Sequence, residues 1–599
     1  MAVLLATLLA WPCVRVGWFG DDILHRAAYS KNPAADGLFL QEGRLKGPMR
    51  MYSFFSGDRE ILRQAVDLGG VPWWCDLSEI RAAFWRPLTA LFSMVDYWLW
   101  PDSSALMHMH SMAWFVGLVM LAAAAYRNFL GAGWAAGLAV LLFAVNDTQA
   151  VPIAFLANRH ILVGAVFGVL AVWAHDRGRR LNQIHCIILA PAAYLLALLS
   201  SESGVAVFAY LLAYALWLET GPVRARCLSL LPYLLLTMGW RILYTSLGYG
   251  ISGMELYVDP GIDPAGFALA VVERVPLLLL GILAFPSPEL YALLTPFAVR
   301  LYWITAVIVL AGLAVLFYPA WRGCRLARFW LTGTVLAVVP LCAAWPGGRS
   351  LALAAFGGMG LLAQTAKNAF PHASSLDQPT KARVWPRRIL GLILLVRLLT
   401  GAGHLHWAPM ALDRMQKGIE LISMAHQSVP DQAGKTVIFV NHPVPLVVAY
   451  LFPIRLLNGD PLPERLRVLA PGLDPVELSR TGEKTLVVRP RNGYAGPPQW
   501  KTDSWTDRRT YVDLESTMNR VERLLLGRKT APARGQKLDL TGVTIEITTL
   551  TGDQRPAEAK FVFKVPLEDP SLCWLAWNRK TWKLDPFPLP RVGETVMLD

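Results

Sequence analysis

Residues 105–126 read ALMHMHSMAWFVGLVMLAAAAY, a run without a single Asp, Glu, Lys or Arg. A helix of about 20 mainly apolar residues crosses the hydrocarbon core of a bilayer. The run therefore predicts a membrane-spanning helix, and it has many counterparts along the chain. Comparable stretches lie at 2–19, 131–149, 159–175, 184–200, 203–219, 227–246, 299–320, 328–345, 350–366 and 388–406.

The composition of the whole chain agrees with a membrane protein. Its 599 residues are 54% hydrophobic and 17% charged, and the mean hydropathy is +0.40. A soluble domain carries roughly 25% charged residues, so a water-soluble enzyme and a disordered chain are both excluded. The net charge of +13 does not indicate nucleic acid, because cytoplasmic loops of membrane proteins collect Lys and Arg. Seven scattered cysteines without a CxxC pair predict neither a disulfide scaffold nor a metal site.

Basic residues in the short loops orient the spans. A further apolar stretch, 265–285, is interrupted by Glu273, Arg274 and Pro276. If it does not cross, every basic cluster falls on one side, so the positive-inside rule favours eleven crossings. We then expect 265–285 to lie in the interface or to re-enter from outside, with the N-terminus in the cytoplasm. The clusters contain Arg127, Arg177, Arg179, Arg180, Arg224, Arg226, Arg322, Arg325, Arg328, Lys367 and Lys381.

The chain divides into two predicted domains. Residues 1–406 form a polytopic membrane domain with a long first loop at 20–104, and residues 407–599 form an extracytoplasmic domain. The second domain is expected to be β-rich, because short stretches alternate apolar and polar residues or are rich in β-branched ones. The predicted fold class is thus a mainly α membrane domain followed by a β-rich α+β domain. The predicted strands lie at 435–440, 484–489, 543–548 and 560–565.

Charged side chains gather at the outer ends of the predicted spans, where charge is costly and often functional. Each of these residues also has a purely structural interpretation, as a solvated helix end, an interfacial anchor, a turn residue or a helix cap. We expect them to meet in one outward-facing cavity. There a carboxylate takes a proton from an acceptor hydroxyl, and arginines hold a lipid phosphate. The residues are Asp21, Asp22, Arg86, Asp96, Asp147, Arg159, Glu202 and Arg349.

Several short motifs resemble those of a known superfamily. They are Gly20-Asp21-Asp22 after the first span, FWRPLTALFSMVDYWLW (84–100), LANRHILVGAVFGVLAVWAH (156–175), LALLSSESGVAVF (196–208) and Gly348-Arg349-Ser350. As a set they resemble the GT-C glycosyltransferases that use polyprenyl-phosphate sugars, including protein O-mannosyltransferases and the lipid A aminoarabinose transferase. In this sequence Ser201 replaces a Lys of the family turn, His160 replaces a polar or small residue, and Ser350 replaces a Tyr. The tail also lacks tetratricopeptide repeats.

The resemblance implies an inverting membrane glycosyltransferase with a polyprenyl-phosphate sugar donor. Asp21 or Asp22 is the implied general base, and Arg159 and Arg349 lie near the lipid phosphate. Arg86 and Glu202 lie at the outer ends of predicted spans, so we expect them to bind substrate as well. The acceptor is a glycan, a lipid or a protein, no nucleic acid is involved, and a divalent cation on the paired carboxylates is left open. The expected location is a bacterial inner membrane or its equivalent.

Three other functions compete with this interpretation. An envelope polysaccharide ligase or polymerase is also polytopic, but it concentrates function in a large late loop, whereas the largest loop here is the first. A lipid or sugar transporter places polar groups and broken helices at mid-membrane in related halves, and no such halves are visible. The third is a degenerate, inactive member of the family, which the replacements at Ser201 and Ser350 allow.

Overall fold

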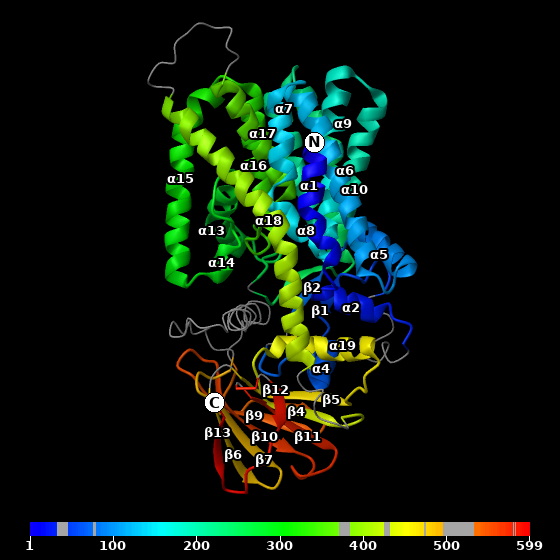
Figure 1. Cartoon of the computed structure of the whole chain (residues 1–599), viewed down its shortest axis with the longest axis vertical. Helices are drawn as coiled ribbons and strands as arrows, with labels where there is room; N and C mark the ends of the chain where they lie inside the picture. Colours follow the sequence, from blue (N-terminus) through cyan, green and yellow to red (C-terminus); the bar gives the residue numbers. More distant parts are fainter. Residues whose placement is uncertain are drawn as a thin grey trace.

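The computed structural model describes residues 1–32, 46–75, 80–254, 256–370, 384–424, 432–472, 475–494, 532–578, 580–581 and 583–598. In these ranges the chain forms a helical domain with a β-rich domain stacked on one of its ends (Figure 1). The predicted fold class is confirmed. Lys381, one of the basic residues used to orient the spans, lies outside the described ranges.

Each predicted span coincides with helical structure. The first and third are broken, because a 3-10 turn follows α1 and a bend of 44° separates α7 from η2 and α8. The helices and turns are α1 (Ala2–Ala10), η1 (Trp11–Arg15), α6 (Ser104–Leu130), α7 (Trp134–Ala144), η2 (Asp147–Gln149), α8 (Ala150–Ala154), α9 (Arg159–Leu181), α10 (Ile184–Ser200), η4 (Glu202–Ala206), α11 (Val207–Trp217), α12 (Val223–Ser246), α15 (Pro296–Arg322), α16 (Arg325–Leu341), α17 (Ala352–Ala369) and α18 (Val384–Met424).

Fewer helices than eleven are long and apolar enough to cross a bilayer. Six of them in the described part of the chain pass that test, or seven if the bent pair of α7 with η2 and α8 counts as one span. The other predicted spans form shorter or less apolar helices. The count of eleven thus exceeds what length and composition support. The chain is nevertheless a multi-pass membrane protein.

The ambiguous stretch 265–285 forms α13 (Pro264–Leu283), which by length and composition alone is also able to cross. The segments on either side of it nevertheless contact the same end of the helical domain. Before it, Asp259 pairs with Arg241 of α12 at 2.6 Å. After it, Glu289 accepts a hydrogen bond of 2.6 Å from the N–H of Gly348, in the turn between α16 and α17. The segment therefore turns back, as the distribution of basic residues indicates.

Basic residues of the short loops lie at the opposite end of the helical domain from Arg241 and Gly348. Lys367 at the end of α17 donates a hydrogen bond of 2.8 Å to the carbonyl of Leu130 at the end of α6. The guanidinium of Arg328, in the first turn of α16, lies 5.0 Å from the ring centre of Trp217 at the end of α11. The N-terminus lies in the same half of the helical domain, away from the β-rich domain (Figure 1). Lys367 and Arg328 therefore lie at the end of the helical domain that is away from the β-rich domain.

After α18, the described part of the C-terminal region holds two sheets, the 3-10 helix η8 (Pro445–Tyr450) and the α-helix α19 (Leu451–Asn458). All four predicted strands are present, as β4, β7, β9 and β10. The antiparallel sheet has the order β13 (Thr595–Leu598), β6 (Val476–Gly482), β7 (Thr485–Pro490), β10 (Pro556–Phe563), β9 (Val543–Leu550) and β8 (Lys537–Leu540). The mixed sheet has the order β12 (Lys583–Pro586), β11 (Leu572–Asn578), β4 (Thr436–His442) and β5 (Arg465–Pro471), with β4 parallel to both neighbours.

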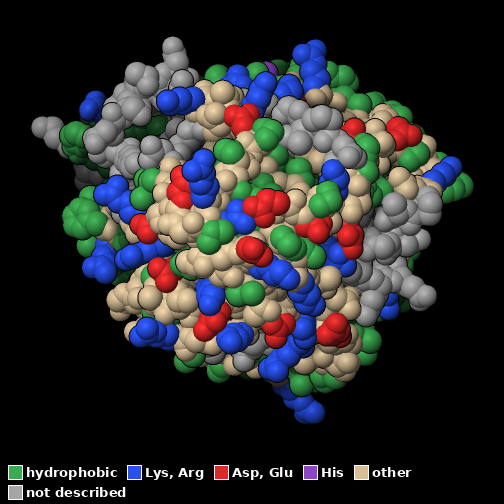
Figure 2. All heavy atoms as spheres, turned by 90° about the horizontal axis from the view of Figure 1, so that it is seen from below, with side chains coloured by type: hydrophobic (Ala, Val, Ile, Leu, Met, Phe, Trp, Pro, Cys, Tyr) green, Lys and Arg blue, Asp and Glu red, His purple; other side chains and the backbone are tan. Residues whose placement is uncertain are grey.

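The surfaces of the two domains differ as their surroundings require. Seen from its far end, the β-rich domain mixes acidic and basic side chains over the whole face (Figure 2). By contrast, α12 and α15 expose large apolar side chains, including Leu235 at 58% and Val315 at 78%. Such exposure is normal only where lipid replaces water. The helices therefore lie in the bilayer and the β-rich domain lies in water.

The first loop packs into the core of the β-rich domain. It contains α2 (Asp21–Ala28), β1 (Ser53–Ser56), α4 (Arg59–Leu68), β2 (Arg81–Ala83) and α5 (Pro87–Leu99). The ring of Trp73 lies 4.7 Å from that of Tyr494 and 5.7 Å from that of Phe561. Strand β2 also joins β1 to β3 (Gly250–Ser252), which follows α12. The first loop, the loop after α12 and the C-terminal region therefore form one layer at the same end of the helices.

The predicted domain limit at residue 406 falls inside α18, which is 41 residues long. At 1.5 Å per residue such a helix is about 60 Å long, roughly twice the hydrocarbon thickness. It leaves the bundle and reaches the β-rich domain (Figure 1), where Ile419 is buried in that domain's core. Hydropathy thus marks where α18 leaves the apolar layer, not where the helix ends.

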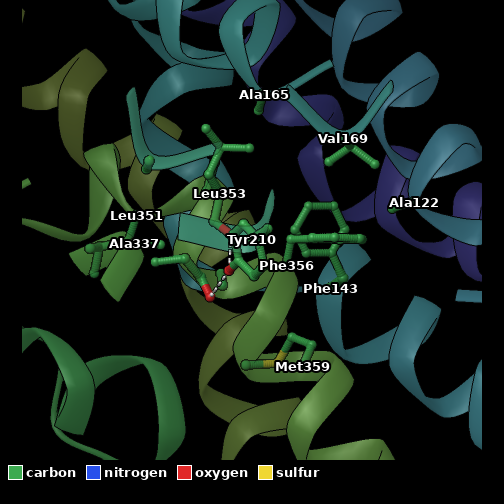
Figure 3. Close-up of a cluster of buried hydrophobic side chains, with 14 of the residues drawn as sticks. Ala122, Phe143, Ala165, Val169, Tyr210, Ala337, Leu351, Leu353, Phe356 and Met359 are labelled. Carbon is green, nitrogen blue, oxygen red and sulfur yellow. Dashed lines mark hydrogen bonds between the residues drawn. The ribbon is translucent and has the colours of Figure 1, made fainter. Parts of the chain in front are cut away.

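Close helix packing in the bundle depends on small residues of α17. A Cβ at Gly357 would lie 2.3 Å from the hydroxyl of Tyr210, and one at Gly360 would lie 2.7 Å from the ring of Trp330. The hydroxyl of Tyr210 donates a hydrogen bond of 2.8 Å to the carbonyl of Leu353 (Figure 3). Small residues let neighbouring backbones approach in the membrane, where no hydrophobic effect drives the helices together. This packing fixes the helices that line the site.

Candidate active site

A cavity of about 670 Å³ lies between the helical domain and the layer formed by the loops. It is within the range of about 300–1,000 Å³ that small-molecule sites occupy. Its polar wall contains four of the predicted site residues, Asp21, Arg86, Glu202 and Arg349. They come from four separate segments, so the tertiary fold brings them together as predicted.

Asp21 is the first residue of α2, directly after Gly20. Gly20 has a positive φ of 51°, which lets the chain turn sharply from the first span into α2. Burial raises the pKa of Asp21 above its ordinary value, and Arg349, the hydroxyl of Tyr450 and Arg86 act in the opposite direction. A carboxylate with a raised pKa that remains close to cations is suited to accept a proton.

Asp22 does not line the cavity, although it is the next residue. It is fully buried, and its carboxylate accepts three backbone hydrogen bonds. They come from Phe19 at 3.1 Å, Leu156 at 3.3 Å and Ala157 at 2.7 Å. Burial raises its pKa to about 7, against these hydrogen bonds. Asp22 thus links the start of α2 to the segment before α9. Of the two aspartates predicted as the general base, only Asp21 lines the cavity.

Arg86 and Glu202 form an ion pair on the cavity wall. Nε of Arg86 donates to Oε2 of Glu202 at 2.8 Å, and the guanidinium lies 4.3 Å from the ring centre of Phe84 and 5.1 Å from that of Tyr52. The other oxygen, Oε1 of Glu202, is buried without a hydrogen-bond partner among the described residues. An orphaned acceptor in a cavity is satisfied when a ligand supplies a donor.

Arg349 lies in the short turn η5 (Gly348–Ser350) between α16 and α17. The carboxylate of Glu289, which follows α13, holds this turn through the N–H of Gly348. A Cβ at Gly348 would lie 2.6 Å from Oε1 of Glu289, so the approach needs glycine. The turned-back α13 segment therefore holds the turn that presents Arg349 to the cavity.

Arg159 is the one predicted phosphate ligand that the structure places elsewhere. Its side chain is 1% exposed and lies outside the cavity lining. It forms an ion pair with Asp96, and it donates to Oγ of Ser111 at 2.9 Å and to the carbonyl of Met107 at 2.7 Å. The cause is helical geometry, since each residue turns about 100° from the one before it. The sequence correctly placed Arg159 at the depth of the cavity in the membrane, but its side chain lies on a face of α9 that does not line the cavity.

His160, next in sequence, faces the cavity in its place. Its Nδ1 lies 3.0 Å from Oγ of Ser201, which lies 2.8 Å from Oγ of Ser203. All three side chains line the cavity. In sequence, His160 and Ser201 were only departures from a family pattern. The two departures lie in two different motifs of the same predicted site, and this coincidence was the only indication in the sequence that His160 and Ser201 lie together.

Two further predicted members also lie away from the cavity. Asp96 pairs with Arg159 and contacts Nδ1 of His110 at 2.6 Å. Asp147 pairs with Arg397 of α18 at 2.8 Å. Buried charges of opposite sign are paired in proteins because an isolated charge is costly. Asp96 and Asp147 therefore hold helices together instead of facing a substrate.

The other wall of the cavity is apolar. It is lined from α11, α12, α13 and α16 by Phe208, Leu212, Leu234, Phe267, Leu336 and Val339. Leu234 of α12 is also 44% exposed, and Leu235 next to it is 58% exposed. The apolar wall therefore reaches the surface that faces lipid. Among the described residues, no group of three or more His, Cys, Asp and Glu side chains is placed to hold a metal ion.

No protein-family model matches the chain, and no curated protein matches it. Similar solved structures include the apo oligosaccharyltransferase from Archaeoglobus fulgidus, with 11% identity, a TM-score of 0.36, and coverage of 78% of this chain and 64% of that chain. Oligosaccharyltransferase AglB from the same organism, in complex with an inhibitory peptide and a dolichol-phosphate, has 12% identity, a TM-score of 0.36, and coverage of 75% and 63%.

A bacterial structure is also similar. ArnT from Cupriavidus metallidurans, bound to undecaprenyl phosphate, has 14% identity and a TM-score of 0.33, with coverage of 67% of this chain and 82% of that chain. The present chain thus spans less than two thirds of the archaeal oligosaccharyltransferase, at 64% and 63% of its length in the two structures.

Proposed function

We propose that this protein is a GT-C-type membrane glycosyltransferase that moves a sugar from a polyprenyl-phosphate donor to an acceptor hydroxyl. The observation that carries the proposal is the cavity, which joins a carboxylate and two arginines at one wall to an apolar wall open toward lipid. A donor that is half lipid and half sugar phosphate needs both surfaces in one site.

In the proposed reaction, Asp21 takes the proton of the acceptor hydroxyl. The oxygen then attacks the anomeric carbon of the donor from the face opposite the phosphate, which inverts the configuration. The bond between that carbon and the phosphate oxygen breaks, and polyprenyl phosphate leaves with the electron pair. Arg349 and Arg86 stabilise the charge that builds on the phosphate. Glu202 keeps Arg86 in place through its ion pair.

The apolar wall takes the first isoprene units of the donor. The polyprenyl chain then leaves past Leu234 into the membrane, because that side chain is both part of the lining and exposed on α12. A site of this kind belongs on the extracytoplasmic face, opposite the basic loops. A bacterial inner membrane or its equivalent is the matching location.

The base is tested on the full chain in lipid nanodiscs with a panel of undecaprenyl-phosphate monosaccharides and an envelope extract as acceptor source. We expect Asp21→Asn to reduce the release of undecaprenyl phosphate by about 10²–10⁴-fold, with an unchanged elution profile. Release at the wild-type rate in this variant would remove Asp21 as the base.

The phosphate contact is tested by binding of undecaprenyl phosphate alone, measured by native mass spectrometry. Loss of one charge-assisted contact costs about 1.5–3 kcal/mol, so Arg349→Ala should weaken binding by about 10–100-fold. Arg26→Ala is the matched control, since Arg26 pairs with Asp102 outside the cavity lining. Equal affinities of wild type and Arg349→Ala would contradict the phosphate site.

The same measurements separate the rival functions. Binding of undecaprenyl phosphate without sugar transfer would favour a transporter or an inactive scaffold, and transfer of whole polysaccharide chains would favour a ligase. A transporter concentrates polar groups at mid-membrane. Here Asp21, Arg86, Glu202 and Arg349 all lie in short turns or first turns at helix ends, which supports the transferase.

A further inference from the structure

Helix α2, which begins with Asp21, rests on the C-terminal domain. Ala27 of α2 is fully buried against Leu456 of α19, and the two residues form a small core between the domains. Leu457 and Leu462 pack around this core. The helix that carries the proposed base is therefore held by a domain more than 400 positions away in sequence.

Two polar contacts bring the same region onto the start of α2. The hydroxyl of Tyr450, the last residue of η8 (Pro445–Tyr450), lies 3.5 Å from Oδ1 of Asp21 as a hydrogen-bond donor. The N–H of Gly20 donates at 3.2 Å to Oε1 of Gln416, near the end of α18. A Cβ at Gly20 would lie 3.8 Å from the Tyr450 hydroxyl, so that hydroxyl lies directly over the turn.

We propose that Tyr450 is a positioning residue for Asp21, so that the C-terminal domain completes the active site. This rests on the function proposed above. By donating to Oδ1, the hydroxyl fixes the carboxylate and leaves Oδ2 for the acceptor proton. The domain is then part of the catalytic centre, not only a platform for the acceptor.

The electrostatic surroundings of Asp21 make the contact measurable. The groups that face Asp21 are Arg349 of η5, Arg86 before α5, Tyr450 of η8 and Asp22 on its own helix. The Tyr450 hydrogen bond lowers the pKa of Asp21, against the burial that raises it. Loss of the hydroxyl should therefore raise the pKa of Asp21 further, and ionised Asp21 should form only at higher pH.

The test measures the protonation of Asp21 without any substrate. Dicyclohexylcarbodiimide labels protonated carboxyl groups, and fragmentation mass spectrometry separates Asp21 from Asp22. We expect labelling of Asp21 in the full chain to fall as pH rises, with the midpoint at a higher pH in Tyr450→Phe than in wild type. The matched control is Tyr494→Phe, which removes a buried hydroxyl of the same domain bonded to the carbonyl of Val488 at 3.2 Å.

The outcomes are distinct. An upward shift of the midpoint in Tyr450→Phe alone supports the proposal. An unchanged or lower midpoint overturns it, and so does an equal shift in Tyr494→Phe, since the effect would then reflect general loosening. Because no sugar donor is used, the result is independent of the proposed reaction. An upward shift together with inactive wild-type protein would leave this contact standing and reject the transferase.

Discussion

At the residue scale, Asp21 and Asp22 are neighbours on one helix with different surroundings. The carboxylate of Asp21 faces the cavity and two arginines, whereas that of Asp22 is closed off by three backbone N–H groups. The proposed chemistry therefore falls on Asp21, whereas Asp22 holds the start of α2 in place. Arg159 and His160 repeat the pattern, because a buried ion pair holds Arg159 while His160 faces the cavity.

The structural role of Asp22 predicts a loss of stability in Asp22→Ala. Three backbone N–H groups lose their acceptor, and each orphaned donor costs about 1–3 kcal/mol. We expect a clearly lower apparent unfolding temperature in detergent, while Asp21→Ala changes it little. An Asp22→Ala protein as stable as wild type would contradict the assignment.

The same residue also predicts a pH dependence of stability. The pKa of Asp22 is raised from 3.8 to about 7 in the folded protein. Between these values the folded state binds a proton that the unfolded state has released, so the contribution of Asp22 to stability falls as pH rises. A scan of unfolding temperature from pH 4 to 8 should show a steeper decline in wild type than in Asp22→Ala, in which Asp21 still has a raised pKa. Parallel pH profiles of the two proteins would contradict it.

At the element scale, α13 and η5 form a coupled pair, because the residue that follows α13 holds the turn that carries Arg349. This coupling predicts that Glu289→Ala weakens binding of undecaprenyl phosphate without touching the cavity. Loss of one hydrogen bond to a charged group is worth about 1.5–3 kcal/mol at most, so we expect roughly tenfold weaker binding. Glu289→Gln keeps a carbonyl acceptor and should bind nearly as wild type. Equal binding by wild type, Glu289→Ala and Glu289→Gln would contradict the coupling between α13 and η5.

The small residues of α17 make a second prediction at this scale. In Gly357→Leu the new side chain meets the Tyr210 hydroxyl, and overpacking of this kind costs about 1–3 kcal/mol. We expect a lower unfolding temperature and a smaller monodisperse fraction on size exclusion. The control is Gly312→Leu in α15, where no atom lies within 4 Å of a Cβ. Equal losses in both variants would mean that close packing at Gly357 is unimportant.

At the scale of the whole molecule, the first loop, the loop after α12 and the β-rich domain lie at one end, and the basic loops lie at the other (Figure 1). The site needs this arrangement, since Asp21, Glu202, Arg349 and Tyr450 come from distant parts of the chain. It follows that labelling from outside should reach one end only.

Cysteine labelling tests this orientation. Val592 is 57% exposed in the β-rich domain, and Arg224 is exposed at the basic end. In a background without the accessible native Cys227, Cys324 and Cys573, Val592→Cys should react with an impermeant maleimide in spheroplasts. Arg224→Cys should react only after permeabilisation. The reverse result would place the cavity in the cytoplasm and reject the donor chemistry proposed here.

The class of the protein and much of its layout follow from the order of its amino acids. Hydropathy located the helices, and loop charge indicated that the α13 segment turns back. Four short strand-like stretches, of which 543–548 and 560–565 alternate with period two, located four strands. Four of the six predicted site residues meet in the cavity, because charged residues at helix ends lie at the same level in the membrane.

The face that each of these residues occupies depends on how the helices pack in three dimensions. Hydropathy records how apolar a residue is but not whether lipid or protein covers it, so it did not separate Arg159 from His160 or Asp21 from Asp22. It also did not place Tyr450, because contact between residues 21 and 450 follows from the packing of α19 on α2. Such contacts depend on side chains meeting across the whole fold, and no local pattern in the chain encodes them.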